Sequence, residues 1–155
     1  MGASGEQTRL AARDVLHGVP VSALMTSRLG VARKGELAGD VARRLLIDNL
    51  VGATVSEEPS DTPRPRRLGL VIASDLAERV ARDGKDLPVE SAMLIDLPNV
   101  HLGDEATTAL DAMWSGDAEV VLVLDGDDEV VGLVTDAEIQ RAMALAALGQ
   151  GHYPR

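Results

Sequence analysis

Cysteine is absent from the 155-residue sequence, which excludes disulfides, thiolate metal sites and cysteine nucleophiles. Aromatic residues are nearly absent as well: Trp114 and Tyr153 are the only two, so the core must consist of aliphatic side chains and methionine. No apolar run approaches the roughly 20 residues that a membrane-spanning helix needs. The N-terminus lacks a basic segment followed by an apolar one, so we expect no signal peptide, no membrane association and a cytoplasmic protein.

Patterns for catalysis and metal binding are also scarce. His17, His101 and His152 are scattered and form no metal-ligand spacing. No nucleophile–base pair, P-loop or Rossmann fingerprint can be recognised by residue type or spacing. The acidic turn 125–129 could hold Ca²⁺, but it lacks the glycine and distal glutamate of an EF-hand loop, so we interpret it as a hairpin turn. The sequence therefore predicts no enzyme, no metal site and no resident cofactor.

Positive charge is concentrated in the first part of the chain, which holds 13 of the 15 Lys and Arg residues. Residues 1–88 carry a net charge of +1 and residues 89–155 a net charge of −11, which together give −10. Such a surface repels nucleic acid and anionic lipid, whose binding depends on cations that neutralise phosphates. We expect neither partner, and we expect the phosphates of any bound nucleotide to face the first half.

An apolar stripe occurs twice in the same helical register. The first copy consists of Ala38, Val41, Ala42, Leu45 and Leu46, spaced as one face of a helix. A shift of 68 positions gives the second copy, Ala106, Ala109, Leu110, Met113 and Trp114. The Gly-Leu-Val run at 69–71 also recurs at 132–134. Two copies of one unit usually pack about a pseudo-twofold axis, so we expect a functional cleft between the copies.

The expected elements follow the same order in both copies. A lead-in helix over 7–17 follows six frayed residues. The first copy is predicted to contain a helical turn 21–25, strand 29–33, helix 36–48, strands 51–55 and 68–72, and helix 74–83. The second is predicted to contain a turn 89–93, strand 100–102, helix 105–115 with Asp104 as its N-cap, strands 120–124 and 130–134, and helix 136–148. Residues 56–67 form a charged, Pro-rich loop.

Each copy therefore reads β-α-β-β-α, an α/β (α+β) fold in which a small sheet packs on two helices. The expected divisions are 1–17, 18–84, 85–148 and a loose tail 149–155.

The strand 120–124, followed by Gly132-Leu133-Val134-Thr135-Asp136-Ala137-Glu138, resembles the corresponding part of a CBS domain, and the repeat resembles a CBS pair, or Bateman module. The resemblance covers residues 18–146. It implies a stand-alone regulatory module that binds an adenosine-containing ligand (AMP, ADP, ATP, S-adenosylmethionine or NAD) between the repeats. It also implies a disc-like homodimer and an unidentified regulated protein partner.

The family's ribose-phosphate motif runs Gly, two apolar residues, Thr or Ser, two variable residues and Asp. In the first copy Gly69 and Asp75 match it, but Ile72 stands at the hydroxyl position. In the second copy Gly132 and Thr135 match, but Glu138 replaces Asp. The resemblance implies that the glycine lets backbone approach the ligand, while the hydroxyl and carboxylate bond to ribose. We expect the second copy to provide the better site, with Met93, Leu94, Ile95 and Val121 as adenine walls.

Each of these residues also has a purely structural interpretation. Thr135 and Asp75 could cap helices, and Met25 and Met93 could be core filler. Arg64, Arg66 and Arg67 could reach phosphates or lie on a solvated loop. The full set of candidate ligand-binding residues is Thr135, Glu138, Asp136, Met93, Leu94, Ile95, Val121, Ser74, Asp75, Met25 and Thr26. Because both motifs are incomplete, a second hypothesis stays open: a degenerate CBS pair that dimerises and binds a protein partner without nucleotide.

Overall fold

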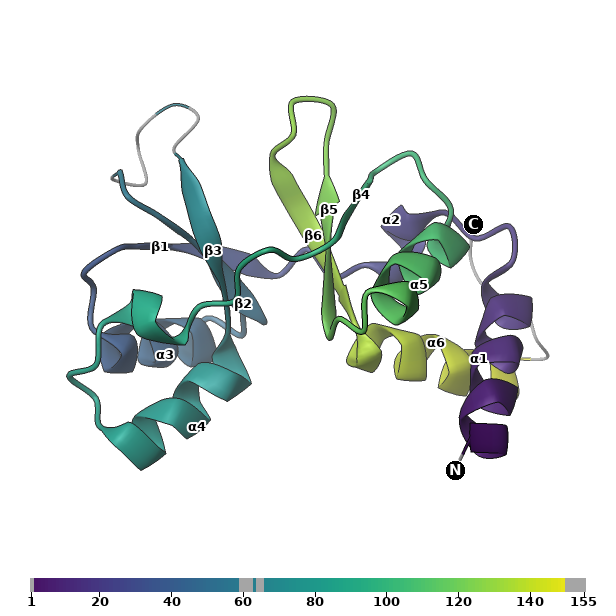
Figure 1. Cartoon of the computed structure of the whole chain (residues 1–155), viewed down its shortest axis with the longest axis horizontal. Coiled ribbons are helices and arrows are strands. Elements are labelled where there is room, and N and C mark those ends of the chain that lie inside the picture. The colour runs from purple at the N-terminus through teal and green to yellow at the C-terminus, as the bar shows by residue number, and fades with distance from the viewer. Residues whose placement is uncertain (1, 59–62, 64–65, 150–155) are drawn as a thin grey trace. The chain divides into compact units, whose positions relative to one another are not determined.

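The computed structural model describes residues 2–58, 63 and 66–149, which form two compact units (Figure 1). Unit 1 contains the described residues of Met1–Ser27 and Leu97–Arg155, and unit 2 contains Arg28–Asp96. The units do not coincide with the sequence repeats 18–84 and 85–148. The segment that leads into each repeat packs in the unit that holds the other repeat's sheet.

Unit 2 holds the sheet of the first repeat. Its elements are β1 (Leu29–Arg33), α3 (Ala38–Ile47), β2 (Gly52–Ser56), β3 (Arg67–Ile72), α4 (Ala73–Asp83) and a 3-10 turn, η1 (Val89–Ala92). The strand order is β1-β2-β3, with β1 parallel and β3 antiparallel to β2. Both helices pack against each other and share one core with the sheet.

Unit 1 holds the sheet of the second repeat. Its elements are α1 (Gly2–Leu16), α2 (Val21–Leu24), β4 (Asn99–His101), α5 (Ala106–Ser115), β5 (Val120–Leu124), β6 (Val130–Thr135) and α6 (Asp136–Leu148). The order β4-β5-β6 repeats the parallel and antiparallel pairing of unit 2. The predicted fold class, two β-α-β-β-α repeats that each place a small sheet on helices, is confirmed.

The predicted stripes form the two cores. In α3 the buried members are Ala38, Val41, Ala42 and Leu45. In α5 they are Ala106, Ala109, Leu110 and Met113. The prediction was wrong for Leu46, which is 56% exposed. Leu45 already takes the inward position in that turn, so Leu46, its immediate neighbour, points away from the core.

Two local predictions at helix starts were also wrong. Helix α1 begins at Gly2, so the first residues are not a frayed extension before a helix 7–17. Asp104 is not the N-cap of α5: that position belongs to Glu105, which makes no side-chain cap bond. The Asp104 carboxylate instead accepts a hydrogen bond from the backbone N–H of His101 at 2.9 Å, which closes the turn after β4.

Helix α1 is anchored to the core of unit 1. Ala12 and Leu16 are completely buried, and α1 packs against α5 and α6. At the surface the Arg9 guanidinium lies 5.2 Å from the centre of the Trp114 ring, a distance typical of a cation–π contact. None of the helices in the described part of the chain is long and apolar enough to cross a membrane.

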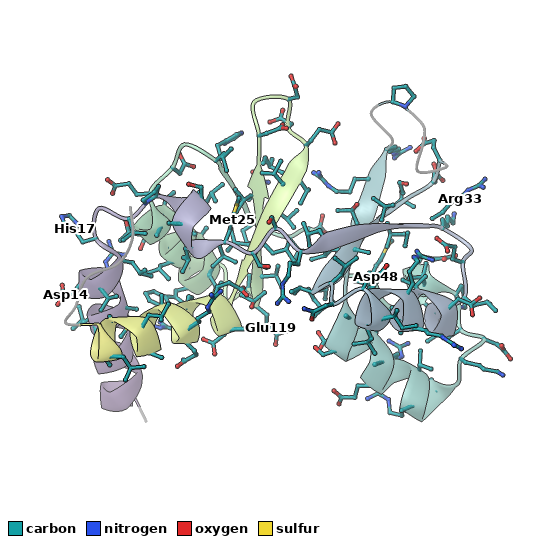
Figure 2. All side chains as sticks on the ribbon, turned by 180° about the vertical axis from the view of Figure 1, so that it is seen from behind. Asp14, His17, Met25, Arg33, Asp48 and Glu119 are labelled. Carbon is teal, nitrogen blue, oxygen red and sulfur yellow. The ribbon has the colours of Figure 1, made fainter. Side chains whose placement is uncertain are left out.

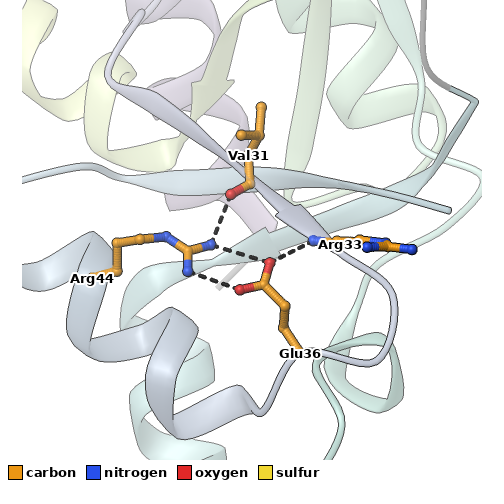
Figure 3. A network of polar contacts seen from close by, with 4 residues as sticks. All are labelled: Val31, Arg33, Glu36 and Arg44. Atoms are coloured by element: carbon orange, nitrogen blue, oxygen red, sulfur yellow. Dashed lines mark hydrogen bonds and ion pairs between the residues drawn. The ribbon is translucent and has the colours of Figure 1, made fainter. Parts of the chain in front are cut away.

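Arg44 joins β1 to α3 in unit 2 (Figure 3). Its guanidinium donates to the Glu36 carboxylate at 2.9 Å and to the Val31 carbonyl oxygen at 2.9 Å. Glu36 also accepts the backbone N–H of Arg33 at 2.7 Å. Partial burial alone would raise the pKa of Glu36, but the bonds and charges of Arg44 and Arg33 outweigh it, so the pKa lies below its ordinary value.

Candidate functional site

A pocket of about 240 Å³ opens beside α4 in unit 2. It is built by the end of β3, one face of α4, and the end of η1 with the segment that follows. Its lining residues are Ile72, Asp75, Glu78, Arg79, Arg82, Ala92 and Leu94. The pocket therefore contains the carboxylate of the first motif and one of the predicted adenine walls.

The helical repeat of α4 explains why charged groups gather in this pocket. Positions 75, 78, 79 and 82 are spaced i, i+3, i+4 and i+7, which places them on one face of the helix. The opposite face carries Leu76, which is 1% exposed and belongs to the core. Burial of Leu76 thus fixes the rotation of α4, and the charged face is turned outward along the pocket.

The pocket separates the two signs of charge along α4. Asp75 lies in the first turn and Glu78 follows it, while Arg79 and Arg82 lie nearer the C-terminal end. A carboxylate in the first turn is favoured by the helix dipole. Asp83 pairs with both arginines through their Nε atoms, at 2.5 Å from Arg79 and 3.6 Å from Arg82.

The segment 93–95 reaches the pocket because it pairs with β3. Leu70 and Leu94 exchange backbone hydrogen bonds of 3.0 and 2.7 Å. Gly69 permits this approach, since a Cβ there would lie 2.6 Å from the Leu94 carbonyl oxygen and 3.0 Å from the Met93 sulfur. The space that a side chain would take is filled by the protein itself. Met93 packs against the unit 2 core, and Ile95 is 59% exposed.

The equivalent strand edge in unit 1 is built in the same way. Thr26 and Leu133 exchange two backbone hydrogen bonds of 2.9 Å. Met25 follows α2 (Figure 2), and its sulfur occupies the space where a Cβ on Gly132 would lie. Met25 also packs against the unit 1 core. The structural interpretation as core filler thus describes the packing of both methionines.

The second motif differs from the first in how its polar groups are used. The Thr135 hydroxyl donates to Glu138 Oε1 at 2.7 Å, and the Thr135 backbone N–H donates to the same oxygen at 2.7 Å. The hydroxyl also accepts the N–H of Ala137 at 3.2 Å. This is a capping box at the start of α6. Helix α4, by contrast, begins after Ile72 without a side-chain cap bond.

The remaining predicted residues divide between the units. Leu94 and Asp75 line the pocket in unit 2, and Ser74 is exposed on α4 without lining it. In unit 1, Val121 is completely buried and Asp136 is exposed. Met93, Leu94 and Ile95 belong to the unit that contains Asp75, whereas Thr135 belongs to the other unit.

The other loops that the sequence singled out have local structural roles. Asp125 accepts the N–H groups of Asp127 and Glu129 at 2.8 and 3.0 Å, which confirms the hairpin turn between β5 and β6. The Arg66 N–H donates to Glu58 at 2.8 Å. Arg64, His152 and the tail beyond Gly149 lie outside the described residues. Within the described residues, no three His, Cys, Asp or Glu side chains form a group that could hold a metal ion.

Sequence reasoning missed three charged residues of the pocket: Glu78, Arg79 and Arg82. Their signal was present, because each lies on the same helical face as Asp75. The motif ends at Asp75, however, and does not extend to the rest of that face. The involvement of Ala92 depends on the pairing of two distant segments and had no local signal.

Several solved structures with this fold are named as CBS domain proteins. The CBS domain of a bacterial CNNM/CorC family Mg²⁺ transporter gives a TM-score of 0.65 at 18% identity, covering 97% of this chain and 86% of that one. A hemolysin-like CBS protein of Oenococcus oeni gives 0.63 at 16% identity, covering 86% and 96%. The CBS domain pair of protein MJ0100, in complex with 5′-methylthioadenosine and S-adenosyl-L-methionine, gives 0.62 at 20% identity, covering 81% and 96%. No protein-family model matches the sequence, and none of the curated proteins matches it either. The chain has the fold of a CBS domain pair.

Proposed function

We propose that this chain is a non-catalytic regulatory module that binds an adenosine-containing ligand in the α4 pocket. The single observation that carries the proposal is the position of Asp75, which lines a pocket at the strand-to-helix junction of the motif. Structures with the same fold contain such ligands: ATP in a CNNM/CorC transporter domain, and 5′-methylthioadenosine with S-adenosyl-L-methionine in the MJ0100 pair. AMP, ADP and NAD belong to the same class of candidates.

Each pocket residue has a chemical task in this proposal. The Asp75 carboxylate accepts hydrogen bonds from the ribose hydroxyls. Hydrogen bonds to a charged acceptor are stronger than those between neutral groups. Ile72 and Leu94 are apolar residues in a lining that is mostly charged, and they give the adenosine its apolar contact surface. Arg79 and Arg82 lie farther along α4 and receive the charged end of the ligand. Both arginines belong to the first half of the chain, which is the half that the charge distribution predicts for the phosphates of a nucleotide.

Thermal unfolding tests the proposal with AMP, ADP, ATP, S-adenosylmethionine, 5′-methylthioadenosine and NAD. A ligand at 100 times its dissociation constant adds about 2.7 kcal/mol to the free energy of unfolding. For a domain of this size the unfolding midpoint rises by several degrees. Asp75→Asn should remove most of this shift and lower the midpoint of the free protein only slightly, because a carboxylate in the first turn of a helix contributes about 0.3–1 kcal/mol. Absence of a shift with all six compounds at millimolar concentration would contradict the proposal.

One observation favours a second function, a homodimeric interaction module without nucleotide. In the second motif Thr135 and Glu138 hydrogen-bond to each other at the start of α6. In the first motif Ile72 stands at the position where the family has a hydroxyl. This candidate predicts a stable dimer by light scattering, retention of a protein partner, and no response to adenosine compounds. A monomer at micromolar concentration would count against it. The regulated partner and a cytoplasmic location are part of both proposals.

A further inference from the structure

The α4 pocket presents carboxylates and guanidiniums together. Asp75 and Glu78 occupy the end near β3, and Arg79 and Arg82 occupy the other end. Asp83 pairs with both arginines and adds another negative charge beside them. Counting these five side chains, three carboxylates face two guanidiniums. The pocket is therefore not a cationic site of the kind that a chain of phosphates requires.

We propose that this pocket selects an adenosyl compound with a zwitterionic 5′ substituent, such as an adenosyl amino acid, over a nucleoside polyphosphate. The inference rests on the proposed function and names the ligand class of the same site. Glu78 stabilises the cationic centre of the substituent by charge attraction at short range. Arg79 and Arg82 receive its carboxylate.

Distances along the helix fit such a ligand. Asp75 and Arg82 are seven residues apart, which corresponds to about 10 Å along the axis of α4. This matches the reach from the ribose hydroxyls of an adenosyl amino acid to its terminal carboxylate. The ion pairs with Asp83 are made by the Nε atoms. A guanidinium carries further donors on its terminal nitrogens, and these can bind a carboxylate in a fork.

The carboxylates of the same pocket repel a polyphosphate. Its charges would begin next to the ribose, beside Asp75 and Glu78, before any phosphate could reach Arg82. Like charges at this spacing repel, and the repulsion is strongest at low ionic strength.

Calorimetric titration of the full chain tests the inference with four probes. S-adenosylmethionine carries a sulfonium, an ammonium and a carboxylate. S-adenosylhomocysteine lacks the sulfonium charge, 5′-methylthioadenosine is uncharged, and ATP is a polyanion. We expect S-adenosylmethionine to bind at least about tenfold more tightly than ATP, a difference of about 1.4 kcal/mol. We expect it also to bind more tightly than 5′-methylthioadenosine.

Two variants assign the discrimination to residues. Arg82→Gln should weaken S-adenosylmethionine binding and leave 5′-methylthioadenosine unchanged. Glu78→Gln should weaken S-adenosylmethionine and strengthen ATP. Matched controls are Arg141→Gln on α6 and Glu119→Gln before β5 (Figure 2), both exposed and neither among the residues that line the pocket. These should change neither affinity.

The outcomes separate this inference from the function on which it rests. If ATP binds as tightly as S-adenosylmethionine, or if Arg82→Gln weakens all four probes equally, the charge selection is wrong and the adenosine site remains. If none of the probes binds, 5′-methylthioadenosine included, both the inference and the proposed function are wrong.

Discussion

Thr135 and Glu138 hydrogen-bond to each other at the start of α6. The hydroxyl and the backbone N–H of Thr135 both donate to one carboxylate oxygen of Glu138, each at 2.7 Å. In the first repeat the corresponding positions are Ile72 and Asp75, and no side-chain cap is present at the start of α4. The two copies of the motif thus differ in structure: the second forms a capping box, and the carboxylate of the first lines a pocket.

The capping role of Thr135 can be measured directly. Thr135→Ala removes the hydroxyl and should lower the free energy of unfolding by about 1 kcal/mol. Urea denaturation measures the loss. Thr108→Ala, a substitution at an exposed position of α5, is the matched control and should cost little. If the ligand binds beside Asp75, the Thr135 variant keeps its ligand response. Loss of the response with unchanged stability would instead place the ligand at the second motif.

Gly69 is required for the pairing of β3 with the segment 93–95. Gly69→Ala would bring a methyl group to 2.6 Å from the Leu94 carbonyl oxygen, which is backbone and cannot rotate away. Overpacking of this kind typically costs about 1–3 kcal/mol. Gly103→Ala is the control, because no atom other than those of its own chain neighbours lies within 4 Å of its Cβ position. Equal unfolding midpoints for the two variants would contradict the close approach of Gly69 to Leu94.

Helix α1 should contribute to stability through Leu16. The side chain is completely buried, so Leu16→Ala should lower the free energy of unfolding by about 2–5 kcal/mol. Leu10→Ala on the same helix is the control, because Leu10 is 63% exposed. Trp114, the single tryptophan, reports the unfolding by fluorescence. A Leu16 variant as stable as the Leu10 variant would show that α1 is not part of the core.

The Glu36–Arg44 pair predicts part of the pH dependence of stability. The folded pKa of Glu36 lies below its ordinary value of 4.5, so the pair stabilises the fold at neutral pH. This contribution is lost as the pH falls from about 4.5 through the lowered folded pKa. Arg44→Gln removes the guanidinium whose hydrogen bond and charge lower the pKa of Glu36, so this pKa should rise. Titration of the Glu36 carboxyl by NMR measures it, and an identical pKa in both proteins would contradict the assignment. The effect on stability is small because solvent screens a partly exposed pair.

The fold was predictable because its signals are local and repeated. The stripes around Val41 and Ala109 predict helices α3 and α5, and the continuous run 120–124 predicts a strand whose bounds agree with the structure. The repeated Gly-Leu-Val run identified the equivalent strands. Helix ends were less predictable, as Asp104 illustrates, since a carboxylate near a helix start can bond to several neighbouring N–H groups.

The site was only partly predictable from the sequence. Asp75 was identified by its motif, but the motif could not tell that Thr135 would bond to Glu138, because the choice depends on side-chain rotamers. The exchange of lead-in segments between units also left no local trace. It is decided by long-range backbone pairs such as Leu70 with Leu94 and Thr26 with Leu133.

The most direct test of ligand binding at Asp75 compares Asp75→Asn with Thr135→Ala in one thermal-shift experiment. Both proteins are unfolded with and without a saturating adenosine compound that stabilises the unaltered chain. We predict that Asp75→Asn loses the ligand-induced rise in the unfolding midpoint, while Thr135→Ala starts from a lower midpoint and keeps the full rise. The reverse pattern, with the rise retained in Asp75→Asn and lost in Thr135→Ala, would contradict a ligand site at the α4 pocket.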